Sequence, residues 1–185
     1  MEFAPLETGR LTLRPYALSD IRALVPLIGA REVAATTLRI PHPYTESDAR
    51  DFIARTEDDR SNGSELRVAI ILRQNDALCG GVGLRIDADH RRAELGYWIG
   101  VPYWGNGYAT EAAAALVQYG FSTLGLHRIF ASHVTNNTAS AGVLRKIGMR
   151  HEGRHRAHIL KWGEFLDLEM YGMLASDAER FATTT

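Results

Sequence analysis

A short glycine-containing turn directly before an alanine-rich helix constrains this chain more than any other feature. Residues 103–112 read YWGNGYATEA, and apolar residues recur from there at helical spacing: Ala109, Ala112, Ala113, Leu116, Val117 and Phe121. The N–H groups of a first helical turn have no partner inside the helix, and the helix dipole places partial positive charge there. Because the turn contains no Lys or Arg, we expect peptide N–H groups to hold an anion such as a pyrophosphate.

Two other glycine-loop motifs do not fit these residues. A Walker loop ends in Gly-Lys-Ser/Thr, whereas Tyr108 follows Gly107 here. The dinucleotide-binding fingerprint needs a third glycine where Thr110 stands, and an acidic residue about 20 positions further on that this chain lacks. The pattern argues against a nucleotide-binding Rossmann domain and leaves a plain helix-starting turn as the simple alternative.

The composition is that of an ordinary globular protein. The 185 residues are 45% hydrophobic and 23% charged with a net charge of −1, which predicts a single domain over residues 1–185 and no direct nucleic-acid partner. No apolar run approaches the roughly 20 residues of a membrane span, and the first residues lack the features of a signal peptide. We therefore expect a cytoplasmic protein with no membrane partner. Cys79, the single cysteine, lies in an apolar segment and is expected to be buried.

Strand-like and helix-like patterns alternate in the first half of the chain. Leu11 and Leu13 indicate a strand, and Ser19 is a candidate N-cap for a helix that Pro26 would kink or shorten. Thr45 with Asp48 resembles a capping box, which opens a helix to about Arg60. Three strands separated by polar turns then predict an antiparallel meander, near residues 66–73, 77–86 and 91–100.

The second half of the chain adds elements of both kinds. After the helix that follows the glycine turn, we expect a strand over 128–134, a helix over 138–147 and a hairpin around 161–163. A strand, a helix and a further strand in succession predict an α/β fold whose mixed sheet is parallel in its centre.

Five segments occur in a fixed order and together carry a family resemblance. Besides the glycine turn they are RLTLRP (10–15), ELGYWIG (94–100), NTAS (137–140) and KIGM (146–149). The chain resembles the GNAT superfamily of acyl-CoA-dependent N-acetyltransferases, and within it the RimJ/RimL-like branch that acetylates the N-termini of ribosomal proteins. The resemblance covers about residues 6–174. It implies a mixed, mostly antiparallel twisted sheet, flanked by helices, whose central parallel strands splay apart into a V-shaped opening.

The resemblance also implies acetyl-CoA as cosubstrate and assigns residues to it. The exposed edge of the splayed strand would pair with the pantetheine amides through main-chain groups of Trp98, Ile99 and Gly100. The side chains of Trp98 and Ile99 are more simply explained as buried strand residues. The remaining cofactor-binding residues are Trp104 (where the family usually has Gln or Arg), Gly105, Asn106, Gly107, Tyr108, Ala109, Thr110 and Asn137.

Glu94 is the candidate base. Amine attack on a thioester needs a deprotonated amine, and a strand glutamate flanked by Ala93 and Leu95 could accept that proton, directly or through water. Burial of such a carboxyl group raises its pKa toward the useful range. The alternative is a glutamate that points outward or pairs with Arg91 or Arg92.

Ser140 is the candidate partner of the leaving thiolate. Many members of the superfamily carry a tyrosine acid seven residues after the asparagine that corresponds to Asn137, but Leu144 occupies that position here. In RimJ/RimL-like proteins a serine three residues after the asparagine is proposed to replace it, and Ser140 stands there. Both residues also have a structural reading, Asn137 as a helix cap and Ser140 as a helix-start hydroxyl.

The acceptor side of the site is the least defined part of the sequence. Several residues lie in segments that border the acceptor groove in related proteins, although such residues are more often solvated or packed than catalytic: His42, Tyr44, His155, Arg156, His158, Trp162 and Asp167. Their spacing does not converge on a metal site, so no metal is assigned. The acceptor amine is left open between a ribosomal-protein N-terminus, a lysine, a polyamine and an antibiotic, and the oligomeric state between monomer and homodimer.

Two functional classes follow. The first is an acetyl-CoA-dependent N-acetyltransferase, and the second is a module of the same fold that binds acyl-CoA without turnover. Glu94 and Ser140 favour catalysis, because a binding module needs neither.

Overall fold

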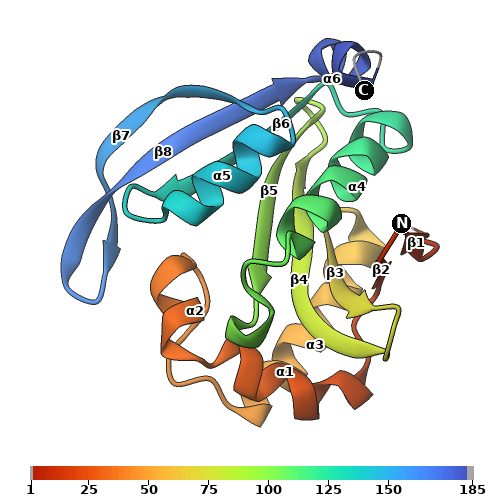
Figure 1. The fold of residues 1–185 in the computed structure, drawn as a ribbon, viewed down its shortest axis with the longest axis vertical. Helices are drawn as coiled ribbons and strands as arrows, with labels where there is room; N and C mark the ends of the chain where they lie inside the picture. Colours follow the sequence, from red (N-terminus) through yellow and green to blue (C-terminus); the bar gives the residue numbers. More distant parts are fainter. Residues whose placement is uncertain (1, 183–185) are drawn as a thin grey trace.

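Eight strands form one open, mixed sheet. In the computed structural model, which describes residues 2–182, the strand order is β1-β2-β3-β4-β5-β6-β8-β7 (Figure 1). The strands are β1 (Leu6–Glu7), β2 (Leu11–Arg14), β3 (Glu65–Leu72), β4 (Ala77–Asp87), β5 (Arg92–Ile99), β6 (Arg128–Val134), β7 (Arg150–Lys161) and β8 (Glu164–Leu174). All neighbours pair antiparallel except β5 and β6, which pair parallel. The expected α/β fold with a parallel centre is confirmed.

Helices cover both faces of the sheet. They are α1 (Ile21–Ile28), α2 (Arg31–Thr36), α3 (Glu46–Asn62), α4 (Tyr108–Ser122), α5 (Thr138–Lys146) and α6 (Ala175–Ala182), with 3₁₀ turns η1 (Leu18–Asp20) and η2 (Val101–Tyr103). One hydrophobic cluster joins α4 and α5 to the sheet through residues such as Leu116, Leu144 and Ile129. A second cluster packs α1 and α3 on the opposite face around Leu24, Ile53 and Trp98. Burial of these apolar side chains against both faces is the main stabilising contribution to the fold.

The parallel strands separate after a short contact. Residues 92–94 of β5 pair with residues 128–130 of β6, although β5 continues to Ile99 and β6 to Val134. Figure 1 shows β5 and β6 diverging below this contact. The last residues of β5 therefore do not pair with the last residues of β6, and the expected V-shaped opening is present.

Local signals explain most element boundaries. The Thr45 side chain accepts a hydrogen bond from the Asp48 N–H at 3.2 Å, and the Asp48 carboxylate accepts from the Thr45 N–H at 2.8 Å, so the capping box begins α3 as expected. Cys79 is fully buried in β4, as its apolar surroundings predict. Pro26 lies inside the short helix α1.

The expectation for Ser19 is wrong. Ser19 lies inside η1, and α1 begins after Asp20, with no side-chain cap. The Asp20 carboxylate instead accepts from the Ala17 N–H at 2.8 Å and from both terminal nitrogens of Arg14 at 2.8 Å. An ionised carboxylate is a stronger hydrogen-bond acceptor than the Ser19 hydroxyl, and this explains why the turn forms around Asp20. The elements that the sequence did not indicate are β1, α2 and α6, which are short.

Candidate active site

A cavity of about 1120 Å³ opens where β5 and β6 separate. Its walls come from the first turn of α4, the end of β5, the start of α5, and the face of the sheet that carries α1 and α3. The cavity therefore runs from the glycine turn on one side of the sheet to residues of the α2–α3 region on the other.

The glycine turn has the backbone geometry expected of an anion site. Gly105 and Gly107 have φ values of 78° and 79°, a left-handed conformation that residues with a Cβ rarely adopt. The first intrahelical hydrogen bond of α4 runs from the Glu111 N–H to the Gly107 C=O at 3.1 Å. The N–H groups of residues 108–110 precede that bond, and these residues line the cavity. The Asn106 side chain fixes the turn by donating to the carbonyls of Tyr103 and Trp104, at 3.1 and 3.0 Å.

Arg10, which the sequence reasoning missed, holds this turn from behind. Its guanidinium donates to the Asn106 C=O at 3.0 Å and to the Glu111 carboxylate at 2.7 Å, and it lies over the Tyr108 ring. Because a trans peptide directs its C=O and N–H to opposite sides, the Gly107 N–H points away from Arg10. The RLTLRP segment thus supplies a cation beside a turn that has none of its own.

The backbone of β5 presents a different set of groups to the opening than expected. The Gly100 N–H donates to the Cys79 C=O at 2.9 Å, so by the alternation of an antiparallel ladder Trp98 also directs its peptide groups toward β4. Tyr97 and Ile99 direct theirs toward the opening. The Trp104 indole donates to the Ile99 C=O at 2.6 Å, which ties the glycine turn to the end of β5.

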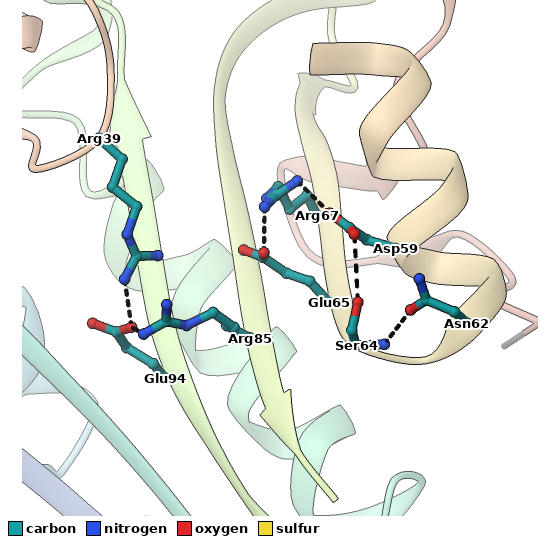
Figure 2. A network of polar contacts seen from close by, with 8 residues as sticks. All are labelled: Arg39, Asp59, Asn62, Ser64, Glu65, Arg67, Arg85 and Glu94. Atoms are coloured by element: carbon teal, nitrogen blue, oxygen red, sulfur yellow. Dashed lines mark hydrogen bonds and ion pairs between the residues drawn. The ribbon is translucent and has the colours of Figure 1, made fainter. Parts of the chain in front are cut away.

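Glu94 lies on the sheet face that carries α1 and α3. Its side chain is 17% exposed, and its Oε2 accepts from Arg39 at 3.0 Å and from Arg85 at 2.5 Å (Figure 2). Neither Arg91 nor Arg92 is its partner. Arg91 donates to the Gly125 C=O, and Arg92 pairs with Asp87. Oε1 of Glu94 has no hydrogen-bond partner among residues 2–182 and remains an open acceptor.

Ser140 lies beside a tyrosine that the sequence reasoning did not single out. The Tyr97 hydroxyl is 2.7 Å from Ser140 Oγ and 3.3 Å from the Ser140 carbonyl oxygen, and both residues line the cavity. Burial raises the pKa of Tyr97 to about 12, which keeps the phenol protonated at neutral pH. The Asn137 side chain accepts from the Ser140 N–H at 3.1 Å and caps α5, so the Ser140 hydroxyl is not the cap.

Of the candidate acceptor residues, Tyr44 alone is brought to the cavity within the described part of the chain. His42 contacts the Gly29 carbonyl, and Trp162 is 56% exposed at the tip of the β7–β8 hairpin. His155 and His158 contact each other on β7 with ring centres 4.8 Å apart. Arg156 is exposed on β7, and Asp167 accepts from the Ala157 N–H at 2.7 Å. His42 therefore lies in the loop before α3 and the other five on the β7–β8 hairpin, outside the cavity.

Among residues 2–182, no cluster of three or more His, Cys, Asp or Glu side chains has the arrangement of a metal site. None of the helices in this part of the chain combines the length and apolarity of a membrane span.

Comparison with known proteins agrees with this geometry. The family model of the acetyltransferase (GNAT) domain matches residues 10–150. The Bacillus licheniformis protein named "Uncharacterized N-acetyltransferase p20" is 36% identical over 171 residues, which cover 91% of this chain and 95% of that protein. The ribosomal protein uS5-alanine N-acetyltransferase of Escherichia coli (strain K12) is 31% identical over 83 residues, covering 45% of this chain and 43% of that protein. The crystal structure of a GNAT-family acetyltransferase from Bacillus anthracis superimposes with a TM-score of 0.84 at 28% identity, covering 94% of this chain and 99% of that one.

Proposed function

Because the chain belongs to the GNAT family of acetyltransferases, we propose that it transfers the acetyl group of acetyl-CoA directly to a primary amine, such as the N-terminus of a ribosomal protein. The observation that carries the proposal is the continuous cavity, which joins the first turn of α4 to the Tyr97–Ser140 pair through the opening between β5 and β6. This path matches a cosubstrate with a pyrophosphate at one end and a reactive thioester at the other. We expect the enzyme to act in the cytoplasm.

Acetyl-CoA would bind through main-chain groups for most of its length. The N–H groups of Gly107 and of residues 108–110 would hold the pyrophosphate, while Trp104, Gly105 and Asn106 shape the turn. The pantetheine arm would lie along the free edge of β5, chiefly at Tyr97 and Ile99, since Trp98 and Gly100 face β4. Asn137 stands at the far side of the opening, at the start of α5.

The leaving thiolate would be stabilised by Ser140 with support from Tyr97. A protonated phenol can donate to the Ser140 Oγ or to its carbonyl oxygen, which leaves the Ser140 hydroxyl hydrogen free to point at the sulfur. That hydrogen bond strengthens as negative charge develops on the sulfur, so it lowers the barrier more than it improves ground-state binding. Leu144, at the position of the usual tyrosine acid, is fully buried and has no polar group to offer.

Glu94 would accept the amine proton, directly or through a water molecule, on its open Oε1. The two arginines on Oε2 fix the orientation of the carboxylate. Solvent is the competing base, because the Glu94 carboxylate is already engaged by Arg39 and Arg85 through Oε2.

An assay of CoA release tests the proposal against a non-catalytic acyl-CoA-binding module. The panel contains acetyl-CoA with ribosomal N-terminal peptides, free amino acids, polyamines and aminoglycosides. Acetylated product from at least one amine, with equimolar CoA, supports the enzyme. Tight acetyl-CoA binding by calorimetry without transfer to any of these amines would instead support the binding module.

A further inference from the structure

The acceptor side of the cavity carries an excess of positive charge next to Glu94. Glu65, Arg85 and Glu94 are register partners across β3, β4 and β5, so their side chains stand in one row on the same face of the sheet. Arg39 reaches Glu94 from the loop after α2 (Figure 2). Two guanidinium groups therefore share one carboxylate, and this group of three has a net charge of +1.

Both guanidinium groups retain unused donors. The Arg39 and Arg85 side chains are 59% and 52% exposed, and within the described part of the chain each makes a single hydrogen bond, to Glu94. A guanidinium has five N–H groups in a planar fork that matches a carboxylate. The pair is thus able to bind a second carboxylate while it holds Glu94.

The other charges that line this wall are already balanced. Arg67 and Glu65 pair with each other and both line the cavity, while the second carboxylate on Arg67, that of Asp59, lies behind it on α3 and does not line the cavity. Figure 2 shows this network apart from the Glu94 group. The Asp48 carboxylate is bound by the N–H and hydroxyl of Thr45, and the charge of Arg55, which also lines the cavity, opposes its own. The uncompensated charge of the acceptor wall is therefore positive and lies at Arg39 and Arg85.

Gly96 provides room beside these arginines. Gly83 and Gly96 are register partners in the row next to Arg85 and Glu94. A Cβ at Gly96 would meet no atom within 4 Å, whereas one at Gly83 would lie 2.9 Å from the Leu66 carbonyl oxygen and 3.2 Å from Arg67 Cγ, so the open space is over β5. Trp98 follows two residues further along β5 and faces the same side. A substrate can therefore lie flat on the sheet between the charged row and an aromatic wall.

On the basis of the proposed function, we infer that the acceptor is an amine that also carries a carboxylate, which Arg39 and Arg85 bind beside Glu94. A charge-assisted bond to a guanidinium is among the stronger polar contacts in proteins. A polyamine would bring further positive charge to a wall that already has an excess. The carboxylate belongs either to a free amino acid or to an acidic side chain near a peptide N-terminus, and the experiment separates these two sources.

Matched acceptor pairs provide the test. The first pair is phenylalanine and 2-phenylethylamine, which differ in the carboxylate alone; the second is a peptide beginning Ser-Asp and the same peptide beginning Ser-Asn. We expect kcat/KM to be about 10- to 100-fold higher for the carboxylate-bearing member of at least one pair, and the responding pair identifies the source. Equal rates within both pairs, or a preference for spermidine, overturn the inference. Failure of the proposed function is distinct, because no amine would then be acetylated.

Variants assign the preference to the arginines. Arg85→Gln and Arg39→Gln should each reduce the preference, the ratio of kcat/KM between the two members of the responding pair, about 10-fold through KM for the carboxylate-bearing member. Because both arginines also hold Glu94, the carboxylate-free member of the pair is the internal reference for any general loss of turnover. Arg73→Gln is the matched control, since Arg73 is a half-exposed arginine that pairs with Glu7 away from the cavity. If Arg85→Gln is poorly folded by its melting temperature, Arg85→Lys keeps the charge and should keep most of the preference. A preference that survives both Arg→Gln changes in folded protein refutes the assignment.

Discussion

At the scale of single residues, substitutions at Tyr97 and Ser140 test whether the Ser140 hydroxyl acts in catalysis or only supports the structure. Asn137 caps α5, so removing the Ser140 hydroxyl leaves the cap in place. We expect Ser140→Ala and Tyr97→Phe to lower kcat by roughly 10- to 100-fold with little change in acetyl-CoA affinity, because the lost bond strengthens only as the thiolate forms. Asn137→Ala should instead lower the free energy of unfolding by about 0.5 to 2 kcal/mol. Melting temperature and kcat measured on the same preparations distinguish a catalytic from a structural Ser140 hydroxyl. A destabilised but fully active Ser140→Ala enzyme would show that the role is structural.

Glu94 is tested at the same scale through the pH dependence of turnover. If Glu94 accepts the amine proton, Glu94→Gln should lower kcat by roughly 10²- to 10⁴-fold at neutral pH and leave acetyl-CoA affinity unchanged. The deficit should shrink as the pH rises, because more of the acceptor is then already a free amine. Wild-type turnover in the variant at neutral pH would transfer the role to solvent.

At the scale of elements, the start of α4 depends on backbone geometry that two glycines allow. Gly107 has a φ of 79°, so Gly107→Val strains the turn by about 1 to 3 kcal/mol and disturbs the N–H groups of α4. We expect acetyl-CoA affinity, measured by calorimetry, to fall at least 10-fold in folded protein. Gly125→Val is the control, because Gly125 also has a positive φ, 62°, but lies outside the cavity. A Cβ added at Gly125 would have no atom within 4 Å. Equal acetyl-CoA affinities in the two variants would show that the pyrophosphate does not bind at this turn.

Elements are also the scale at which the sequence was most informative. Periodicity and turn residues predicted β3 to β6, α3 to α5 and the β7–β8 hairpin, because these depend on local patterns of burial and capping. Side-chain partners were predictable only where they are close in sequence, as for Thr45 and Asp48. Arg39 with Glu94, Arg10 with Asn106 and Tyr97 with Ser140 are separated by 55, 96 and 43 residues. Sheet register and helix packing create those contacts, whereas the arginines closest to Glu94 in the sequence, Arg91 and Arg92, bind elsewhere.

At the scale of the whole molecule, the tip of the β7–β8 hairpin contacts the end of α2, more than 120 residues earlier in the chain. The Lys161 ammonium donates to the carbonyls of Ala34 and Thr37, at the end of α2, and lies 5.1 Å from the centre of the Trp162 ring. Burial lowers the pKa of Lys161. The hairpin thus connects β6, which pairs with β8, to the end of α2 (Figure 1).

Because β5 and β6 separate after a short contact, the sheet has a weak junction between these two strands, which is called the seam below. The two halves, β1–β5 and β6–β8, share three register pairs, so the seam holds fewer backbone bonds than any full-length strand pair beside it. A ligand that pairs with both free edges would act as the missing part of the sheet. Acetyl-CoA at 100 times its Kd should therefore raise the free energy of unfolding by about 2.7 kcal/mol and the Tm by roughly 5 to 10 °C. Hydrogen exchange should slow first at Tyr97, at Ile99 and within residues 131–134, and protection confined to α4 would show that the ligand does not pair with the free edges of β5 and β6. The lifetime of the folded protein would then depend on the concentration of acetyl-CoA around it.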